Sequence, residues 1–254
     1  RYRRRSDAGG ARVDPAYRGM TPVLLPGNMC DARLWTNAVR DVLPGVVDAD
    51  LALDDGIAAM AARTLASVEG RLLPVGFSMG SIVAVEMWCQ APSRIAGLVL
   101  LGYNATADLP ERAAHRPFQQ AEVLGGGLER VLVEELKPNY LAEAQRGNLP
   151  LLDLLRDMGM ALGPDVFVRQ SEALRLRADR VEALSSMTVP VLYGCGAEDR
   201  LCPPVWHERW TAMTADAEFV EFPETGHMLP LEAPNALAAT IARWRAAKGG
   251  ELSQ

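Results

Sequence analysis

Short apolar runs alternate with amphipathic stretches along most of this chain, and this alternation limits the folds that it can adopt. Each apolar run has the length of a buried strand, and each amphipathic stretch has the length of a helix. Strands and helices that alternate in this way build βα units on a parallel sheet. The expected strands are 21–25, 46–50, 71–77, 96–103, 189–195 and 217–222, and the expected helices are 31–43, 55–68, 79–90, 203–213 and 234–246. We therefore expect an α/β fold with a mostly or wholly parallel sheet of about six strands, flanked by helices.

One interval, residues 104–187, interrupts the alternation. It contains no good strand pattern, but helical patterns occur at 128–136, 149–161 and 165–178. We interpret it as a helical cap inserted over the edge of the sheet; the alternative is that its helices extend the core. The expected domains are thus a core of 20–103 and 188–254 and a cap of 104–187.

Composition and charge exclude several classes of protein. With 254 residues, 49% apolar and 23% charged, the chain can form one large soluble domain. No apolar run is long enough to cross a bilayer, and no apolar segment of a secretory signal follows the Arg-rich residues 1–19, so we expect a cytoplasmic protein.

Residues 1–19 carry +4 of a formal net charge of −6, which leaves about −10 for residues 20–254. An acidic body argues against nucleic acid or membrane as partner. The basic tail is expected to be a flexible extension before Met20, with a binding arm as the alternative.

The cysteines and histidines do not indicate a metal site. Four cysteines show no CxxC spacing and are expected to be reduced thiols, and the three histidines do not pair at ligand spacing. We expect no metal and no cofactor.

Ser78 lies between two glycines in the segment Gly76-Phe77-Ser78-Met79-Gly80, after an expected strand and before an expected helix. This strand–turn–helix context is typical of a nucleophile elbow, in which a strained turn exposes the serine Oγ. Gly76 and Gly80 would be needed because a Cβ at either position would clash where strand and helix cross. The alternative is a plain βα turn with an N-capping serine.

A serine nucleophile needs a base, and the base needs an orienting acid. His227 follows the last expected strand, and Asp199 follows the strand before it, so both should lie at the same sheet edge as Ser78. Glu198 is the alternative acid. We expect His115, in the cap, and His207, in a helix, to be surface residues.

Two backbone N–H groups are candidates for an oxyanion hole. One belongs to Met79, directly after the serine, and the other to Asn28 in the loop after the first strand, with Met29 as the alternative. The alternative is that Pro26-Gly27-Asn28 forms a simple turn with no role in catalysis.

Taken together, these motifs resemble the α/β-hydrolase superfamily over residues 20–247, including its chain order Ser78, Asp199, His227. Two features depart from many relatives: Pro26 stands where a histidine is common, and there is little room for an extra N-terminal hairpin. The resemblance implies a capped serine esterase that cleaves a carboxylic ester through an acyl-serine intermediate. The same triad also supports C–C bond hydrolysis, lactone or thioester hydrolysis and acyl transfer, and a receptor without turnover is a further alternative.

The expected substrate is a small to medium, apolar ester or acyl compound, and a homodimer is left open. Apolar residues of the cap and of the loops beside the motifs suggest this pocket, although such residues more often only pack. The candidates are Trp35, Met158, Met160 and Met228, with Leu154 and Phe167.

Overall fold

The computed structural model describes residues 19–136 and 140–252, and within them the chain forms one six-stranded sheet. Every pair of neighbouring strands is parallel, in the order β2-β1-β3-β4-β5-β6. The strands are β1 (Met20–Leu25), β2 (Val47–Asp48), β3 (Arg71–Phe77), β4 (Leu98–Leu101), β5 (Val191–Gly196) and β6 (Ala217–Phe222). The expected fold class is confirmed. The expected tail falls, except for Gly19, outside the described residues.

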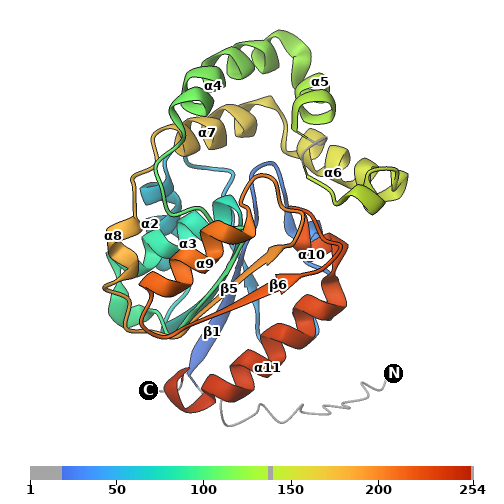
Figure 1. Cartoon of the computed structure of the whole chain (residues 1–254). Helices are drawn as coiled ribbons and strands as arrows, with labels where there is room; N and C mark the ends of the chain where they lie inside the picture. Colours follow the sequence, from blue (N-terminus) through green and yellow to red (C-terminus); the bar gives the residue numbers. More distant parts are fainter. Residues whose placement is uncertain (1–18, 137–139, 253–254) are drawn as a thin grey trace, which may run out of the picture.

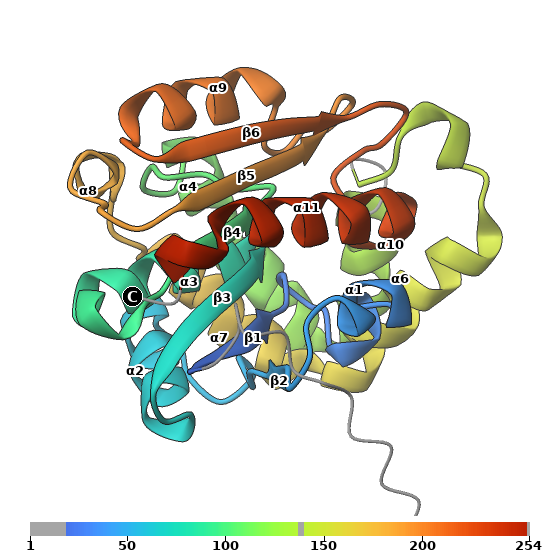
Figure 2. The same cartoon turned by 90° about the horizontal axis from the view of Figure 1, so that it is seen from below.

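Helices cover both faces of the sheet, because successive residues of a strand point to opposite faces. Leu98 and Leu100 of β4 belong to one apolar core, and Val99 and Leu101 belong to the other. The first core is covered by α2 (Ile57–Ser67), α3 (Met79–Gln90) and α9 (Pro204–Met213), and the second by α1 (Asn37–Asp41) and α11 (Pro234–Leu252). Seen from below, the strands lie side by side with α11 along one side and α2 and α3 on the other (Figure 2).

Two expected elements are shorter than their patterns. The stretch 31–43 is not one helix, because Trp35 and Thr36 take extended backbone angles between a 3₁₀ turn at Ala32–Leu34 and α1. The strand expected at 46–50 is reduced to β2, whose two residues are exposed at the edge of the sheet.

Residues 104–187, called here the inserted segment, connect β4 to β5 and contain helices but no strand in the part that is described. In Figure 1 its helices α4, α5, α6 and α7 lie together above the sheet and its covering helices. The helices are α4 (Pro110–Glu122), α5 (Leu128–Arg130), α6 (Leu149–Leu162), α7 (Pro164–Arg175) and α8 (Val181–Leu184), with π-helical turns at Val123–Gly127 and Val131–Leu136 and a 3₁₀ turn at Glu143–Gln145. The sequence patterns did not predict α4, which has no buried residue.

The inserted segment has a small apolar core of its own. Leu128 and Val131 pack there against Val166 and Phe167 of α7, and Met29 of the loop after β1 joins them. The segment is therefore packed onto the loop that follows the first strand. None of the described helices combines the length and apolar character needed to cross a membrane.

Candidate active site

Ser78 connects the end of β3 to the start of α3 in a strained turn. Its φ of 52° and ψ of −113° lie outside the regions that residues with a side chain usually adopt. The turn needs its two glycines, because a Cβ on Gly76 would lie 2.5 Å from the Gly80 carbonyl oxygen and a Cβ on Gly80 would lie 2.0 Å from that of Leu25. The close packing at these two glycines holds the strained Ser78 at the carboxyl edge of the sheet.

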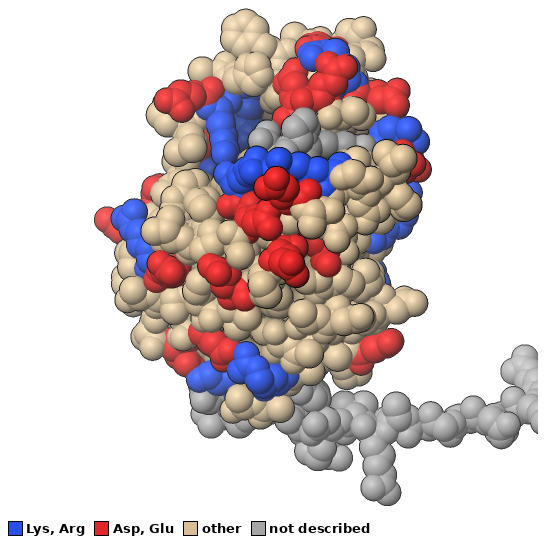
Figure 3. Space-filling view, turned by 45° about the vertical axis from the view of Figure 1, so that its right-hand side comes forward, with Lys and Arg blue, Asp and Glu red and all other residues tan. Residues whose placement is uncertain are grey.

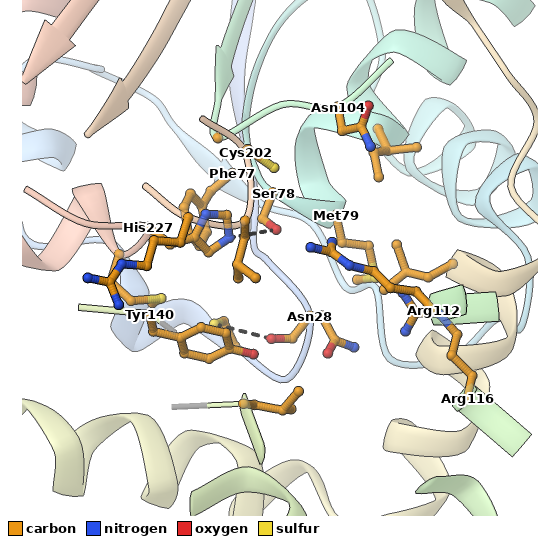
Figure 4. Close-up of a pocket in the computed structure, with 18 of the residues that line it drawn as sticks. Asn28, Phe77, Ser78, Met79, Asn104, Arg112, Arg116, Tyr140, Cys202 and His227 are labelled. Carbon is orange, nitrogen blue, oxygen red and sulfur yellow. Dashed lines mark hydrogen bonds between the residues drawn. The ribbon is translucent and has the colours of Figure 1, made fainter. Parts of the chain in front are cut away.

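His227 and Asp199 reach the same edge from the loops after β6 and β5. The distance from Ser78 Oγ to His227 Nε2 is 3.0 Å, and Figure 4 shows this hydrogen bond at the pocket wall. His227 Nδ1 lies 2.8 Å from Asp199 Oδ2. Two consecutive hydrogen bonds thus link the three predicted side chains, from the hydroxyl to the imidazole and from the imidazole to the carboxylate.

Asp199 is buried, 3% exposed, and fully hydrogen-bonded. Its Oδ1 accepts the backbone N–H groups of Leu201 and Cys202, each at 2.8 Å. Burial raises the pKa of Asp199, but His227 and these two N–H donors outweigh it and hold the pKa below its usual value. The alternative acid, Glu198, instead accepts the N–H of Glu143 at 2.8 Å.

Backbone contacts with the inserted segment hold the loop of His227. The Tyr140 carbonyl oxygen accepts the N–H groups of His227 at 2.7 Å and Met228 at 3.2 Å. The carboxylate Oε2 of Glu232 joins the same two parts of the chain, because it accepts the N–H of Ala142 at 2.8 Å and that of Gly226 at 3.1 Å. Three hydrogen bonds therefore tie this part of the chain to residues 140–142 of the inserted segment, and the fourth, from Gly226 to Glu232, lies within the part that carries His227.

Two backbone N–H groups beside Ser78 have no acceptor within the described residues: those of Met79 and Asn28. Both residues line the pocket into which Ser78 opens. The loop of Asn28 comes this close because Gly27 has no side chain; a Cβ there would lie 2.8 Å from the ring of Phe77 and 3.4 Å from Ser78 Cβ. The alternative donor, Met29, is occupied, since its N–H donates to Gln170 Oε1 at 2.8 Å. The geometry thus favours Asn28 over Met29.

Ser78 opens into a pocket of about 380 Å³ between the sheet edge and the inserted segment. That volume is of the size that holds a small organic molecule. Its lining includes Asn28, Phe77, Ser78, Met79, Ile82, His227 and Met228 from the core and Arg112, Arg116, Leu136, Tyr140, Leu174 and Arg177 from the inserted segment.

A strained serine, its base and acid in the order Ser78, Asp199, His227, and two free N–H donors occur together at one end of a parallel sheet. The model of the alpha/beta hydrolase family matches residues 23–240. The chain belongs to the alpha/beta hydrolase family. Membership in this family supports a hydrolase activity.

Individual relatives of this chain are distant. It is 33% identical over 78 residues to the abhydrolase domain-containing protein ACTT2 of Alternaria alternata. The matched segment covers 26% of this chain and 30% of that relative. The match thus spans less than a third of the relative's length. Among solved structures, an esterase from Thermogutta terrifontis with bound malate superposes with a TM-score of 0.82 at 22% identity, over 90% of both chains. The enol-lactonase of Burkholderia xenovorans LB400 superposes with a TM-score of 0.78 at 18% identity, over 92% of this chain and 94% of that one. At these identities the two structures share the fold.

Of the four residues predicted to line the substrate pocket, the structure brings only Met228 there. Both Met158 and Met160 belong to α6. The side chain of Met158 is buried in an apolar core, whereas Met160 is 42% exposed to solvent. Residues two apart on a helix point about 200° away from each other, so these two could not share one pocket. Trp35 is buried and lines a second cavity of about 220 Å³. Leu154 and Phe167, also suggested for the pocket, pack against apolar clusters instead.

The expectation that His207 lies on the surface is wrong. His207 is fully buried, and its Nε2 accepts the N–H of Tyr103 at 2.9 Å, while Nδ1 lies 3.3 Å from the Pro203 carbonyl oxygen. Burial lowers its pKa to about 4. The imidazole stacks on the ring of Phe219 in β6 and accepts from the residue Tyr103 just after β4, and no local sequence pattern reveals these tertiary contacts. His115 is exposed, as expected, at the rim of the pocket.

Gln170 of α7 is a site residue that sequence reasoning missed. It is 1% exposed, and its Oε1 accepts from Met29 N–H at 2.8 Å and from Asn28 Nδ2 at 3.2 Å. Its Nε2 donates to the Leu51 carbonyl oxygen at 3.1 Å. A lone glutamine in an amphipathic helix gives no signal in sequence, because its partners lie more than 100 residues away. Among the described side chains, no group of three or more His, Cys, Asp or Glu could hold a metal ion.

Proposed function

We propose that this member of the family is a serine hydrolase that cleaves a carboxylic ester through an acyl-serine intermediate. The observation that carries the proposal is the 3.0 Å contact between Ser78 Oγ and His227 Nε2, in a relay that ends on the buried carboxylate of Asp199. A nucleophile and base within hydrogen-bond reach, with the base oriented by an acid, are what acyl transfer to serine requires.

In the first half of the reaction Ser78 Oγ attacks the ester carbonyl carbon, and its proton passes to His227 Nε2. The carbonyl oxygen becomes an oxyanion that accepts the N–H groups of Met79 and Asn28. The carboxylate of Asp199 stabilises the imidazolium and keeps the remaining proton on Nδ1. Collapse of the tetrahedral intermediate breaks the bond to the alcohol, which leaves with the proton from Nε2.

In the second half a water molecule gives its proton to His227 Nε2 and attacks the acyl-serine carbon. Breakage of the ester bond to Ser78 then releases the carboxylic acid and returns the proton to Oγ. The enol-lactonase and the esterase among the structural neighbours perform hydrolysis by name, and this supports ester or lactone substrates for the present chain.

A mass-spectrometric experiment tests the proposal. The intact protein is incubated with a fluorophosphonate, and the rates of hydrolysis of 4-nitrophenyl esters from C2 to C12 are measured. We expect one adduct and measurable turnover, both of which are lost in Ser78→Ala and kept in Ser67→Ala, which changes a surface serine of α2. An adduct without turnover of any ester would instead favour C–C bond hydrolysis, acyl transfer or a receptor. If no adduct forms, the proposal is wrong.

A further inference from the structure

Guanidinium groups dominate the charged side chains of the pocket lining. Four arginines line it: Arg112 and Arg116 from α4, Arg177 from the segment after α7 and Arg200 from the loop after β5. The space-filling view shows basic side chains gathered at the hollow below the helices of the inserted segment (Figure 3). The chain as a whole is acidic, with a net charge of −6, so this concentration of positive charge is local.

Two of the four arginines are neutralised in part by one buried carboxylate. Asp108 Oδ2 accepts Arg116 Nε at 2.6 Å, and Asp108 Oδ1 accepts Arg177 Nη1 at 2.9 Å. Arg177 is nearly buried and also donates to the carbonyl oxygens of Thr106 and Ala107. These bonds fix the two guanidinium groups in place. One carboxylate facing two guanidinium groups still leaves a positive charge.

The other two arginines, Arg112 and Arg200, are exposed and form no ion pair with any residue in 19–136 or 140–252. Glu135, the carboxylate that lines the pocket, is already engaged by Arg130 at 2.8 Å and by Gln119 at 2.7 Å. The pocket therefore holds more positive than negative charge.

The charge of Arg112 acts on groups around the pocket. It opposes the upward pKa shift that burial causes in the thiol of Cys202 and in the hydroxyl of Tyr140. In Figure 4 the side chains of Arg112 and Arg116 lie across the pocket from His227 and Tyr140. An ester held with its carbonyl at Ser78 could thus extend its other end toward α4.

The lining also contains apolar side chains, which suit the carbon chain of such a ligand. Five of them are Phe77, Ile82, Leu136, Leu174 and Met228. Arginine binds carboxylate and phosphate groups through two parallel N–H donors, and a cleft with one sign of charge raises the local concentration of ligands with the other sign.

We propose that the substrate of this hydrolase carries an anionic group, a carboxylate or a phosphate, which Arg112 binds while Ser78 attacks the ester carbonyl and Arg200 adds positive charge to the same pocket. This inference rests on the proposed function, since it concerns the same pocket. It replaces the apolar substrate that the sequence suggested with an ester that has an apolar middle and a charged end.

Three synthetic esters, with the same number of methylene groups between the ester carbonyl and the end group, test the proposal. The first is the 4-nitrophenyl monoester of adipic acid, which ends in a carboxylate. The second, 4-nitrophenyl 6-methylheptanoate, replaces that carboxylate with an isopropyl group of the same shape. The third, 4-nitrophenyl 5-phosphonopentanoate, ends in a phosphonate. We expect kcat/KM at least tenfold higher for one of the two anionic esters than for the neutral one, and the ratio between the two anionic esters distinguishes carboxylate from phosphate.

Two variants locate the effect. Arg112→Gln and Arg200→Gln should each lower the anionic-to-neutral ratio of kcat/KM about fivefold to tenfold, chiefly through a higher KM for the anionic ester. Arg112→Lys should keep part of the preference for the anionic ester, because lysine keeps the positive charge but cannot donate two parallel hydrogen bonds. The matched control is Arg146→Gln, an exposed arginine of the inserted segment outside the pocket lining, which should leave the ratio unchanged.

Failure of this inference can be told from failure of the proposed function. Equal or faster turnover of the neutral ester, or a ratio that survives both arginine variants, would overturn the anionic substrate and leave the serine hydrolase standing. If no ester is turned over, binding decides: calorimetry with Ser78→Ala should show monomethyl adipate binding at least tenfold more tightly than methyl 6-methylheptanoate. Equal affinities there would overturn the inference.

Discussion

Gln170 of the inserted segment accepts the backbone N–H of Met29 at 2.8 Å and thereby removes that donor from the reach of a substrate. The same oxygen holds the side chain of Asn28 at 3.2 Å. Helix α7 thus shapes the loop of Asn28, which lines the pocket and whose N–H has no acceptor within the described residues, and Gln170 is a positioning residue for the proposed oxyanion hole.

Replacing Gln170 by Met, which has a similar shape but no amide oxygen, should lower kcat about 10-fold to 100-fold with little change in KM. The loss follows because one misplaced oxyanion donor costs about that much or more. Gln170→Glu keeps the acceptor oxygen and should recover part of the rate. A fall in thermal stability with kcat unchanged, measured in the same preparations, would show that Gln170 only packs.

Asp199→Asn should lower kcat roughly 10⁴-fold, as loss of the orienting carboxylate does in other serine triads. An asparagine amide would donate to His227 Nδ1 and leave the proton on Nε2, which could then no longer accept from Ser78. Glu198→Gln is the adjacent control and should change kcat less than about threefold, because Glu198 contacts Glu143 rather than His227. Steady-state kinetics on one 4-nitrophenyl ester compares the two, and a larger loss in Glu198→Gln would reverse the assignment of the acid.

Ser78→Gly should unfold at a higher denaturant concentration than Ser78→Ala. The serine adopts a φ of 52°, which costs a residue with a Cβ about 1 kcal/mol or more and costs glycine almost nothing. We expect the free energy of unfolding to be about 1 kcal/mol higher in the glycine variant, with both variants inactive. Urea titrations at fixed pH measure the difference. Equal stabilities would mean that the turn relaxes once the serine hydroxyl is gone.

Burial of His207 should make the protein less stable in acid. The unfolded chain takes up a proton near pH 6.5, whereas the pKa in the folded protein is lowered to about 4, so the unfolded state binds more protons between these values. The free energy of unfolding should therefore fall as the pH drops from about 6.5 to about 4, by about 3 kcal/mol in total, with no further loss from this residue below that range.

Urea titrations between pH 7 and pH 4.5 test the effect of His207. In His207→Gln, whose amide oxygen can still accept from Tyr103, the free energy of unfolding should fall over this range by about 2 kcal/mol less than in the native protein. His115→Gln, which changes an exposed histidine, should keep the native slope. The assignment fails if the His207 and His115 variants lose stability in parallel.

The parts of the site that sequence predicted are those set by local chain geometry. Gly76, Ser78 and Gly80 define their turn within five residues, and the strand ends that carry Asp199 and His227 follow from apolar runs of strand length. Because parallel strands end at one edge, the three side chains had to meet there.

The parts that sequence did not predict depend on packing between distant segments. Helix α4 has no buried residue to mark it, yet it brings Arg112 and Arg116 to the pocket. The rotation of α6 about its axis decided that Met158 would be buried and Met160 exposed, and a count of apolar residues does not give that rotation. His207 looked like a surface residue because its partner, the N–H of Tyr103, lies 104 positions away.

The three hydrogen bonds between residues 140–142 and the part of the chain that carries His227 make the inserted segment part of the reaction machinery. A hinged movement that carried these residues off the core would release the imidazole together with the cover. Ligand exchange that keeps the imidazole in position therefore requires residues 140–142 to stay on the core. For protein engineering, the segment can be exchanged with that of a relative only if the replacement offers the same backbone edge to the histidine loop.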